Sequence, residues 1–299
     1  MKFNLCAVTM GALALGVTAR PSAEGVKAQP AMRHVRGGVV GEVFGRDHDR
    51  TYARASATGS SGSSSPSTTG SASSGSGSSS GSLPASSGTS ALSAAKTIAA
   101  GESFDGGMVM FDRGVSCTGQ EEGGDSDAVF QLEDGASISN VIIGPNQIEG
   151  IHCQGACSLT NVWWSAVCED AFTIKNQEAG ETTTISGGGA FGADDKVLQH
   201  NGAGTLSVSG FTVEDFGKLY RACGNCDSMY ERHVVISDVT ASNGDLIAGI
   251  NSNYGDTAKI SGLTASGVET ICERFEGNDS GDEPTSLGTG NDGTYCIIS

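Results

Sequence analysis

Six charged residues recur in the second half of the chain at spacings that could assemble one chemical site. They are Glu149, Glu169, Asp170, Lys196, Lys218 and Arg221. The segment VCEDAFTIK, residues 167–175, poses the question most sharply, because two adjacent carboxylates precede a run typical of a strand. Neighbouring side chains of a strand point to opposite faces, so one of the two acids would face any core. Burial of a carboxylate without a partner is costly, so this pair requires a compensating group.

The spacing of these residues is close to a constant period. From Glu149 to Glu169 is 20 residues, from Asp170 to Lys196 is 26, and the last two basic residues follow 22 and 25 residues later. In a chain that coils with this period, the six residues would lie above one another. With coils stacked ~4.8 Å apart, the row would span roughly 14 Å, the length of a few sugar units.

The two ends of this row suit different parts of a polyanion. Three converging carboxylates need a cation between them, and hard oxygen ligands at flexible spacing suit Ca²⁺, with water or substrate completing the shell. The three basic residues come from a region, residues 96–299, that holds nine Lys and Arg against 30 Asp and Glu, a formal charge of −21. Their concentration against the prevailing charge predicts a surface that binds a polyanion.

A repeated tetrad indicates the elements that would position these residues. The pattern is an aliphatic residue, Ser or Thr, a turn-compatible residue and usually an apolar residue, and it occurs as ISNV (138–141), LTNV (159–162), ISGG (185–188), VSGF (208–211), ISDV (236–239) and ISGL (260–263). Short β-prone runs and turns surround each copy, and the chain has 45 glycines and six prolines. Periods of this size predict a stacked solenoid. We therefore predict an all-β fold, a right-handed parallel β-helix of about eight coils with ladders of Ile, Val and Leu in its core; an irregular β-sandwich would not place one tetrad six times.

The first third of the chain differs in composition. Residues 1–19 combine Lys2, an apolar run and a small-x-small exit, which is typical of a secretory signal peptide. We interpret residues 20–95 as a disordered extension, a basic segment followed by a Ser/Gly-rich linker, because this composition cannot bury enough apolar surface to fold. Residues 96–299 remain as one folded domain. We therefore expect a secreted, extracellular protein.

Charge and cysteine content narrow the partners further. So acidic a domain is repelled by nucleic acid and by anionic membranes, so we expect neither as a partner, and we expect a monomer. Cys6 leaves with the signal peptide, and eight cysteines remain. An even number in a secreted chain predicts disulfides. A zinc site at residues 153–157 and 223–226 is the alternative, and the sequence leaves the pairing open.

The segments that carry the row also resemble a known family. They are EGIHCQGACSLTNVWW, CEDAFTIK, GAFGADDKVLQHN and FGKLYRACGNC, which are similar, in this order, to the successive motifs of family 3 pectate lyases from bacteria, fungi and oomycetes. The resemblance covers most of residues 96–299 and implies a right-handed parallel β-helix. It also implies calcium-dependent cleavage of polygalacturonate, the de-esterified form of pectin, by β-elimination.

The resemblance assigns roles residue by residue. The family's calcium-binding acids fall on Glu149, Glu169 and Asp170, although relatives commonly have Asp at the first position and a further acid where this chain has Ala166. Lys196 falls on the proposed base position. Lys218 and Arg221 would bind substrate and stabilise charge. Arg221 is the second candidate for the base, because an arginine acts in other pectate lyase families, and the sequence leaves this choice open.

Three functions compete at this point. The first is a pectate lyase, in which Lys175 could also reach the substrate groove. The second is a β-helical polygalacturonase, whose paired carboxylates would act as acid and base but which has no obvious use for the basic residues. The third is a non-catalytic wall-binding protein, which the Ser-rich stalk favours. We interpret the acidic segment 121–127 as a solvated loop, and His152 and His200 as structural.

Overall fold

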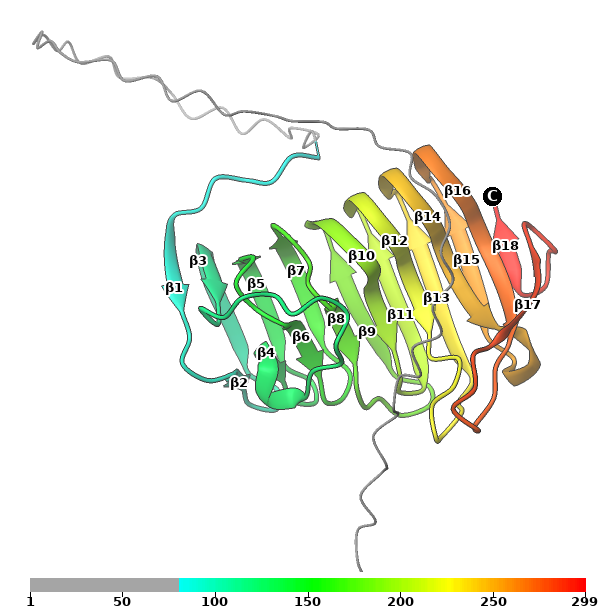
Figure 1. Ribbon diagram of the computed structural model, residues 1–299, viewed down its shortest axis with the longest axis horizontal. Helices are drawn as coiled ribbons and strands as arrows, with labels where there is room; N and C mark the ends of the chain where they lie inside the picture. The colour runs from blue at the N-terminus through cyan, green and yellow to red at the C-terminus, as the bar shows by residue number, and fades with distance from the viewer. Residues whose placement is uncertain (1–80) are drawn as a thin grey trace, which may run out of the picture. The chain divides into compact units, whose positions relative to one another are not determined.

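The computed structural model describes residues 81–299, which form strands and turns with two three-residue 3₁₀ helices (Figure 1). The predicted signal peptide and most of the predicted linker lie outside the described residues. The strands are β1 (Gly88–Ala91), β2 (Lys96–Ile98), β3 (Ser103–Asp112), β4 (Ala128–Leu132), β5 (Ser137–Ile143), β6 (Glu149–Cys153), β7 (Ser158–Trp164), β8 (Asp170–Ile174), β9 (Thr182–Ser186), β10 (Gly189–His200), β11 (Gly204–Ser209), β12 (Thr212–Ala222), β13 (Arg232–Ser237), β14 (Thr240–Asn251), β15 (Thr257–Ser261), β16 (Thr264–Glu276), β17 (Thr285–Thr289) and β18 (Cys296–Ile298). The 3₁₀ helices are η1 (Asp125–Asp127) and η2 (Ser252–Tyr254).

The chain winds as a right-handed parallel β-helix of about eight coils, as predicted. Every strand pairing in the described residues is parallel except that between β16 and β17. The composition suggested that the domain starts at residue 96. Strand pairing begins earlier, with β1. The coils stack along the long direction of Figure 1, from β1 to β18.

Three faces run along this stack. The first contains β9, β11, β13 and β15. The second contains the first halves of β12, β14 and β16. The third, the site face, contains β4, β6, β8 and the second halves of β10, β12, β14 and β16. The long strands of the later coils therefore bend from the second face into the site face.

The repeated tetrad marks the corner between the first two faces. Its third residue has a left-handed backbone in all six copies, with φ between 53° and 66°: Asn140, Asn161, Gly187, Gly210, Asp238 and Gly262. Glycine adopts this conformation freely, and Asn and Asp tolerate it better than other residues. Each copy of the tetrad therefore forms the same turn of the backbone. Because every coil turns at the same point, equivalent residues of successive coils stay aligned.

Side chains stacked inside the coils form the core. On the site face, register pairs align one inward ladder: Phe130, Ile151, Phe172, Leu198, Tyr220, Ala248 and Cys272. All of these side chains are buried. Each fully buried large apolar side chain contributes about 1.5–3 kcal/mol, so the ladder fixes the coils beneath the site.

Four disulfides join all eight cysteines of the described chain, which excludes the zinc alternative. They link Cys117 to Cys168, Cys153 to Cys157, Cys223 to Cys226, and Cys272 to Cys296. Neither of the 3₁₀ helices within residues 81–299 is long or apolar enough to cross a bilayer.

Candidate active site

Register alignment brings three of the predicted residues into one row. Lys196 on β10 lies opposite Asp170 on β8 and opposite Lys218 on β12. Glu149 begins β6, and counting back from the pairing of Ile151 with Phe172 puts it level with Asp170. Arg221 lies three residues further along β12, opposite Gln199. The period of the sequence therefore places these side chains on adjacent coils of one face.

The tightest acidic cluster includes a residue that the sequence did not suggest. Carboxylate oxygens of Glu122, Glu149 and Glu169 all lie within 4.8 Å of one another. Glu149 and Glu169 are buried, whereas Glu122 is exposed. Asp170 is buried beside this cluster and faces Lys196. The segment 121–127 is largely exposed, as expected, but it also supplies an acid to the site.

A disulfide explains how Glu122 reaches the site. The segment between β3 and η1 runs across the neighbouring coils (Figure 1). Cys117 in this segment is bonded to Cys168, the residue before Glu169. Nε2 of Gln120 also donates a hydrogen bond to the carbonyl of Cys168, at 2.8 Å. These two bonds hold the segment against the start of β8, next to the acidic pair.

Hydrogen bonds fix the Glu149 carboxylate. Its Oε1 accepts from the backbone N–H of Gly123 at 3.0 Å, and its Oε2 lies 3.1 Å from Nε2 of His152. Nδ1 of His152 in turn lies 2.8 Å from Oδ1 of Asp125. His152 is fully buried and hydrogen-bonded, so it is structural as expected, and it also orients an acid of the site.

Lys196 is surrounded by carboxylates. Its Nζ lies 3.2 Å from Glu169, 3.3 Å from Asp170 and 2.7 Å from Asp195. Burial opposes the charged form, but the three carboxylates outweigh it and raise the pKa of Lys196 above its usual range. Lys196 is therefore an ammonium ion in this arrangement, the opposite of the lowered pKa that a lysine base requires.

Glu169 and Asp170, the two buried acids beside Lys196, are only partly compensated in charge. Burial is the main reason that the pKa of the Glu169 carboxyl is raised; Lys196 opposes the rise, and Glu149 and Glu122 add to it. Oε2 of Glu169 and Oδ1 of Asp170 are buried without a hydrogen bond from the described residues. One ammonium thus leaves part of this carboxylate group uncompensated.

Asp195 joins the two lysines of the row. Its carboxylate lies 2.7 Å from Nζ of Lys196 and 2.5 Å from Nζ of Lys218. Hydrogen bonds from both lysines outweigh burial and lower the pKa of Asp195. Asp195 lies where the register between β10 and β12 shifts, so strand alternation alone did not predict its direction.

Arg221 has a different environment. It is 8% exposed, and its Nη1 donates to the carbonyl of Ala222 at 2.7 Å and to Oδ1 of Asn251 at 3.1 Å. Its guanidinium carbon lies 4.2 Å from the centre of the Phe275 ring. Within residues 81–299 it forms no ion pair with a carboxylate. Burial lowers the pKa of Arg221, against a smaller opposing effect of Asp256.

The basic residues face a hollow of about 280 Å³. It is lined by Glu122, Asp195, Lys196, Gln199, Lys218, Arg221, Gly224, Asn225, Glu283 and Pro284. Lys175, predicted to bind substrate, lines a separate hollow with Asn176 and Tyr230. The structure therefore brings Lys196, Lys218 and Arg221 together and places Lys175 apart from them.

Comparison with known proteins agrees with this geometry. The family model described as Pectate lyase matches residues 80–282. The chain belongs to the pectate lyase family. It is 59% identical over 198 residues to pectate lyase H of Emericella nidulans, covering 66% of this chain and 75% of that protein. It is 56% identical over 211 residues to probable pectate lyase D of the same fungus, covering 70% and 79%.

Solved pectate lyase structures share the fold. The catalytic domain of pectate lyase PelI from Erwinia chrysanthemi has a TM-score of 0.58 and 34% identity, over 72% of this chain and 95% of that one. PelI in complex with tetragalacturonic acid has a TM-score of 0.57 and 36% identity, over 68% of each chain. The family and its relatives identify this pectate lyase as an enzyme, against the polygalacturonase and the non-catalytic alternatives.

Proposed function

We propose that this pectate lyase is a secreted, calcium-dependent enzyme that cleaves polygalacturonate by β-elimination and releases 4,5-unsaturated oligogalacturonides. The observation that carries the proposal is the hollow in which Lys196, Lys218 and Arg221 lie close to the carboxylate cluster of Glu122, Glu149 and Glu169. The complex of PelI with tetragalacturonic acid supports the same class of substrate.

The residues present fit calcium. All the donors are carboxylate oxygens, three of them converge within 4.8 Å, and one buried oxygen of Glu169 lacks a partner among the described residues. Glu122, Glu149 and Glu169 would hold the ion, with Asp170 beside them, and oxygen-only sites of this kind suit Ca²⁺. When bound, calcium would supply positive charge for the uronate carboxylate as it gains electron density.

The reaction requires removal of a weakly acidic proton. A base takes the proton from C5 of a galacturonate unit, the C4–O bond breaks, and a double bond forms between C4 and C5. The leaving oxygen takes up a proton, so no water is consumed. Cationic groups beside the carboxylate lower the barrier because they stabilise the charge that develops on it.

Between the two predicted bases, the geometry favours Arg221. A base must be able to lose its own proton, and Asp195, which is not among the proposed calcium ligands, lies 2.7 Å from Nζ of Lys196 and holds its proton there. Arg221 is buried, and its pKa is lowered. We therefore assign Arg221 as the base, and Lys196 and Lys218 as the cations that bind substrate carboxylates.

Product mass and paired variants test this assignment. The end produced by elimination is lighter by one water than the end produced by hydrolysis. Arg221→Ala should lower kcat by about 10²- to 10⁴-fold, the usual contribution of a general base, whereas Lys196→Ala should mainly raise KM. A larger loss of kcat in Lys196→Ala would reverse the assignment, and hydrolytic products would overturn the proposed chemistry.

Secretion, domain limits and oligomeric state belong to the same proposal. We propose that residues 1–19 are a signal peptide, that the linker which follows ends before β1 (Gly88–Ala91), and that the enzyme acts as an extracellular monomer. The four disulfides support secretion, since such bonds persist in oxidising compartments.

A further inference from the structure

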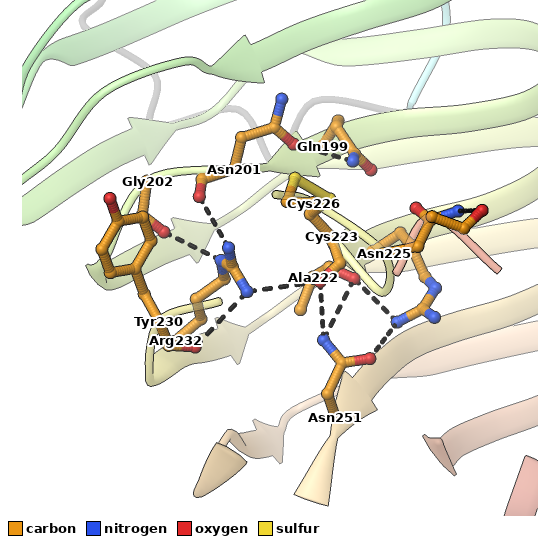
Figure 2. Close-up of a disulfide and its surroundings, with 12 residues drawn as sticks. Gln199, Asn201, Gly202, Ala222, Cys223, Asn225, Cys226, Tyr230, Arg232 and Asn251 are labelled. Atoms are coloured by element: carbon orange, nitrogen blue, oxygen red, sulfur yellow. Dashed lines mark hydrogen bonds between the residues drawn. A yellow bond between two sulfur atoms is a disulfide. The ribbon is translucent and has the colours of Figure 1, made fainter. Parts of the chain in front are cut away.

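A network of buried hydrogen bonds holds the side chain of Arg221 on the side away from the hollow. Its Nη1 donates to Oδ1 of Asn251, a fully buried residue at the end of β14. The Nδ2 of Asn251 donates to the carbonyl of Cys223 at 2.9 Å and to Oδ2 of Asp256 at 3.2 Å. Figure 2 shows Asn251 below the carbonyl groups of Ala222 and Cys223, with Arg232 to their left, where its Nη1 donates to the carbonyl of Cys223.

This network fixes which way the Asn251 amide points. Nδ2 faces two acceptors, a carbonyl and a carboxylate, so rotating the amide by half a turn would set oxygen against oxygen. Oδ2 of Asp256 also accepts from the backbone N–H of Asn251 at 2.9 Å, which fixes the residue itself. The Asn251 oxygen can therefore face only Arg221.

Packing against Phe275 and Gly224 further restricts the position of the Arg221 guanidinium. The ring of Phe275 covers it at 4.2 Å, and Gly224 leaves room for Nη2, since a Cβ on this glycine would lie 2.4 Å from that atom. Within the described chain, only Nη1 of Arg221 donates hydrogen bonds to protein acceptors. Nε and Nη2 remain for a ligand in the hollow.

We infer that Asn251 is a positioning residue: it holds one end of the Arg221 guanidinium so that the other end faces the substrate. Asp256 orients the Asn251 amide in turn. This inference rests on the proposed role of Arg221 at the substrate. Asn251 itself does not line the hollow, so it acts only through Arg221.

A double-mutant cycle with a matched control tests the inference. Asn251→Ala should lower kcat about 10- to 100-fold, because small misplacements of a reacting group cost this much. In the Arg221→Ala background, Asn251→Ala should change kcat less than twofold, because its effect passes through Arg221. Asn253→Ala is the control, because Asn253 lies two residues after Asn251 and does not contact Arg221. This variant removes two hydrogen bonds between Asn253 and Gly277, and its kcat should stay near the wild-type value.

A purely structural role predicts something different. Asn251→Ala would then lower kcat by the same factor in the wild-type and the Arg221→Ala backgrounds. That additive result would overturn the inference.

Crystal structures of the variants separate this inference from the proposed function. The Arg221 guanidinium should leave its wild-type position in Asn251→Ala and keep it in Asn253→Ala. An unmoved guanidinium in Asn251→Ala refutes the positioning role whether or not the enzyme forms unsaturated products. A displaced guanidinium in an enzyme that forms no such products refutes the proposed reaction and leaves the positioning role intact.

Discussion

Replacing Glu169 by Gln should separate a calcium ligand from an ordinary ion-pair partner. Without calcium, Glu169 is attracted by Lys196 at 3.2 Å and repelled by Glu149, whose carboxylate lies within 4.8 Å. With an effective dielectric constant of about 20, the attraction is about 5 kcal/mol and the repulsion about 3.5 kcal/mol or more. Burial of the charge reduces the difference further. We therefore expect the free energy of unfolding of Glu169→Gln in chelator to lie within about 2 kcal/mol of the wild-type value.

Calcium should then distinguish the two proteins. At a free calcium concentration of 100 times Kd, a single site adds about 2.7 kcal/mol to wild-type stability. A hundredfold loss of affinity in Glu169→Gln would reduce this increment to about 0.4 kcal/mol. Denaturant titrations with chelator and with calcium measure both quantities. The exposed Glu102 is a suitable control, because its side chain makes no hydrogen bond or ion pair in the described chain.

Two results would refute this reasoning. An equal calcium increment in Glu169→Gln and wild type would show that Glu169 does not bind the ion. A loss of 3–5 kcal/mol in chelator, the usual cost of breaking a buried ion pair, would show that Lys196 alone compensates the charge.

Two further predictions follow from buried groups. Burial lowers the pKa of His200 from 6.5 to about 3, and the hydrogen bond to the carbonyl of Ala203 opposes this shift only in part. The neutral ring has a partner at each nitrogen, the carbonyl of Ala203 at Nε2 and the hydroxyl of Tyr220 at Nδ1. Protonation therefore favours the unfolded chain: the stability is fully present above pH ~6.5 and is lost towards pH ~3, by about 2–3 kcal/mol at pH ~4.5. Urea titrations at both pH values should show this loss relative to His200→Gln, and equal acid sensitivity of the two proteins would contradict it. Gly224→Ala should lower kcat and stability together, because the new Cβ would lie 2.3 Å from Pro284 and 2.4 Å from Arg221. Gly88→Ala is the control, because its Cβ enters open space. Wild-type kinetics in Gly224→Ala would show that Arg221 is not closely packed against Gly224.

The row of charged residues was predictable because the fold converts sequence period into position. Parallel strands in register place Asp170, Lys196 and Lys218 on adjacent coils, so the intervals between them were enough. The tetrads were informative for the same reason, since their third residue is the left-handed corner of each coil.

Residues outside this regular pattern could not be predicted in the same way. Glu122 reaches the acids because a disulfide holds its segment to Cys168, and disulfide pairing cannot be read from the sequence. Asp195 lies at a register shift, where strand alternation fails. The resemblance placed Lys196 at the base position, which requires a lowered pKa, whereas its nearest charged neighbours are three carboxylates.

Ultraviolet absorbance during incubation with polygalacturonate tests the central claim most directly. Each elimination creates a double bond conjugated with a carboxylate, which absorbs, whereas hydrolysis creates none. We predict that absorbance rises with calcium, stops rising when chelator is added and resumes when calcium is restored. A growth of reducing ends without absorbance, or a rate unchanged by chelator, would contradict calcium-dependent β-elimination at this site.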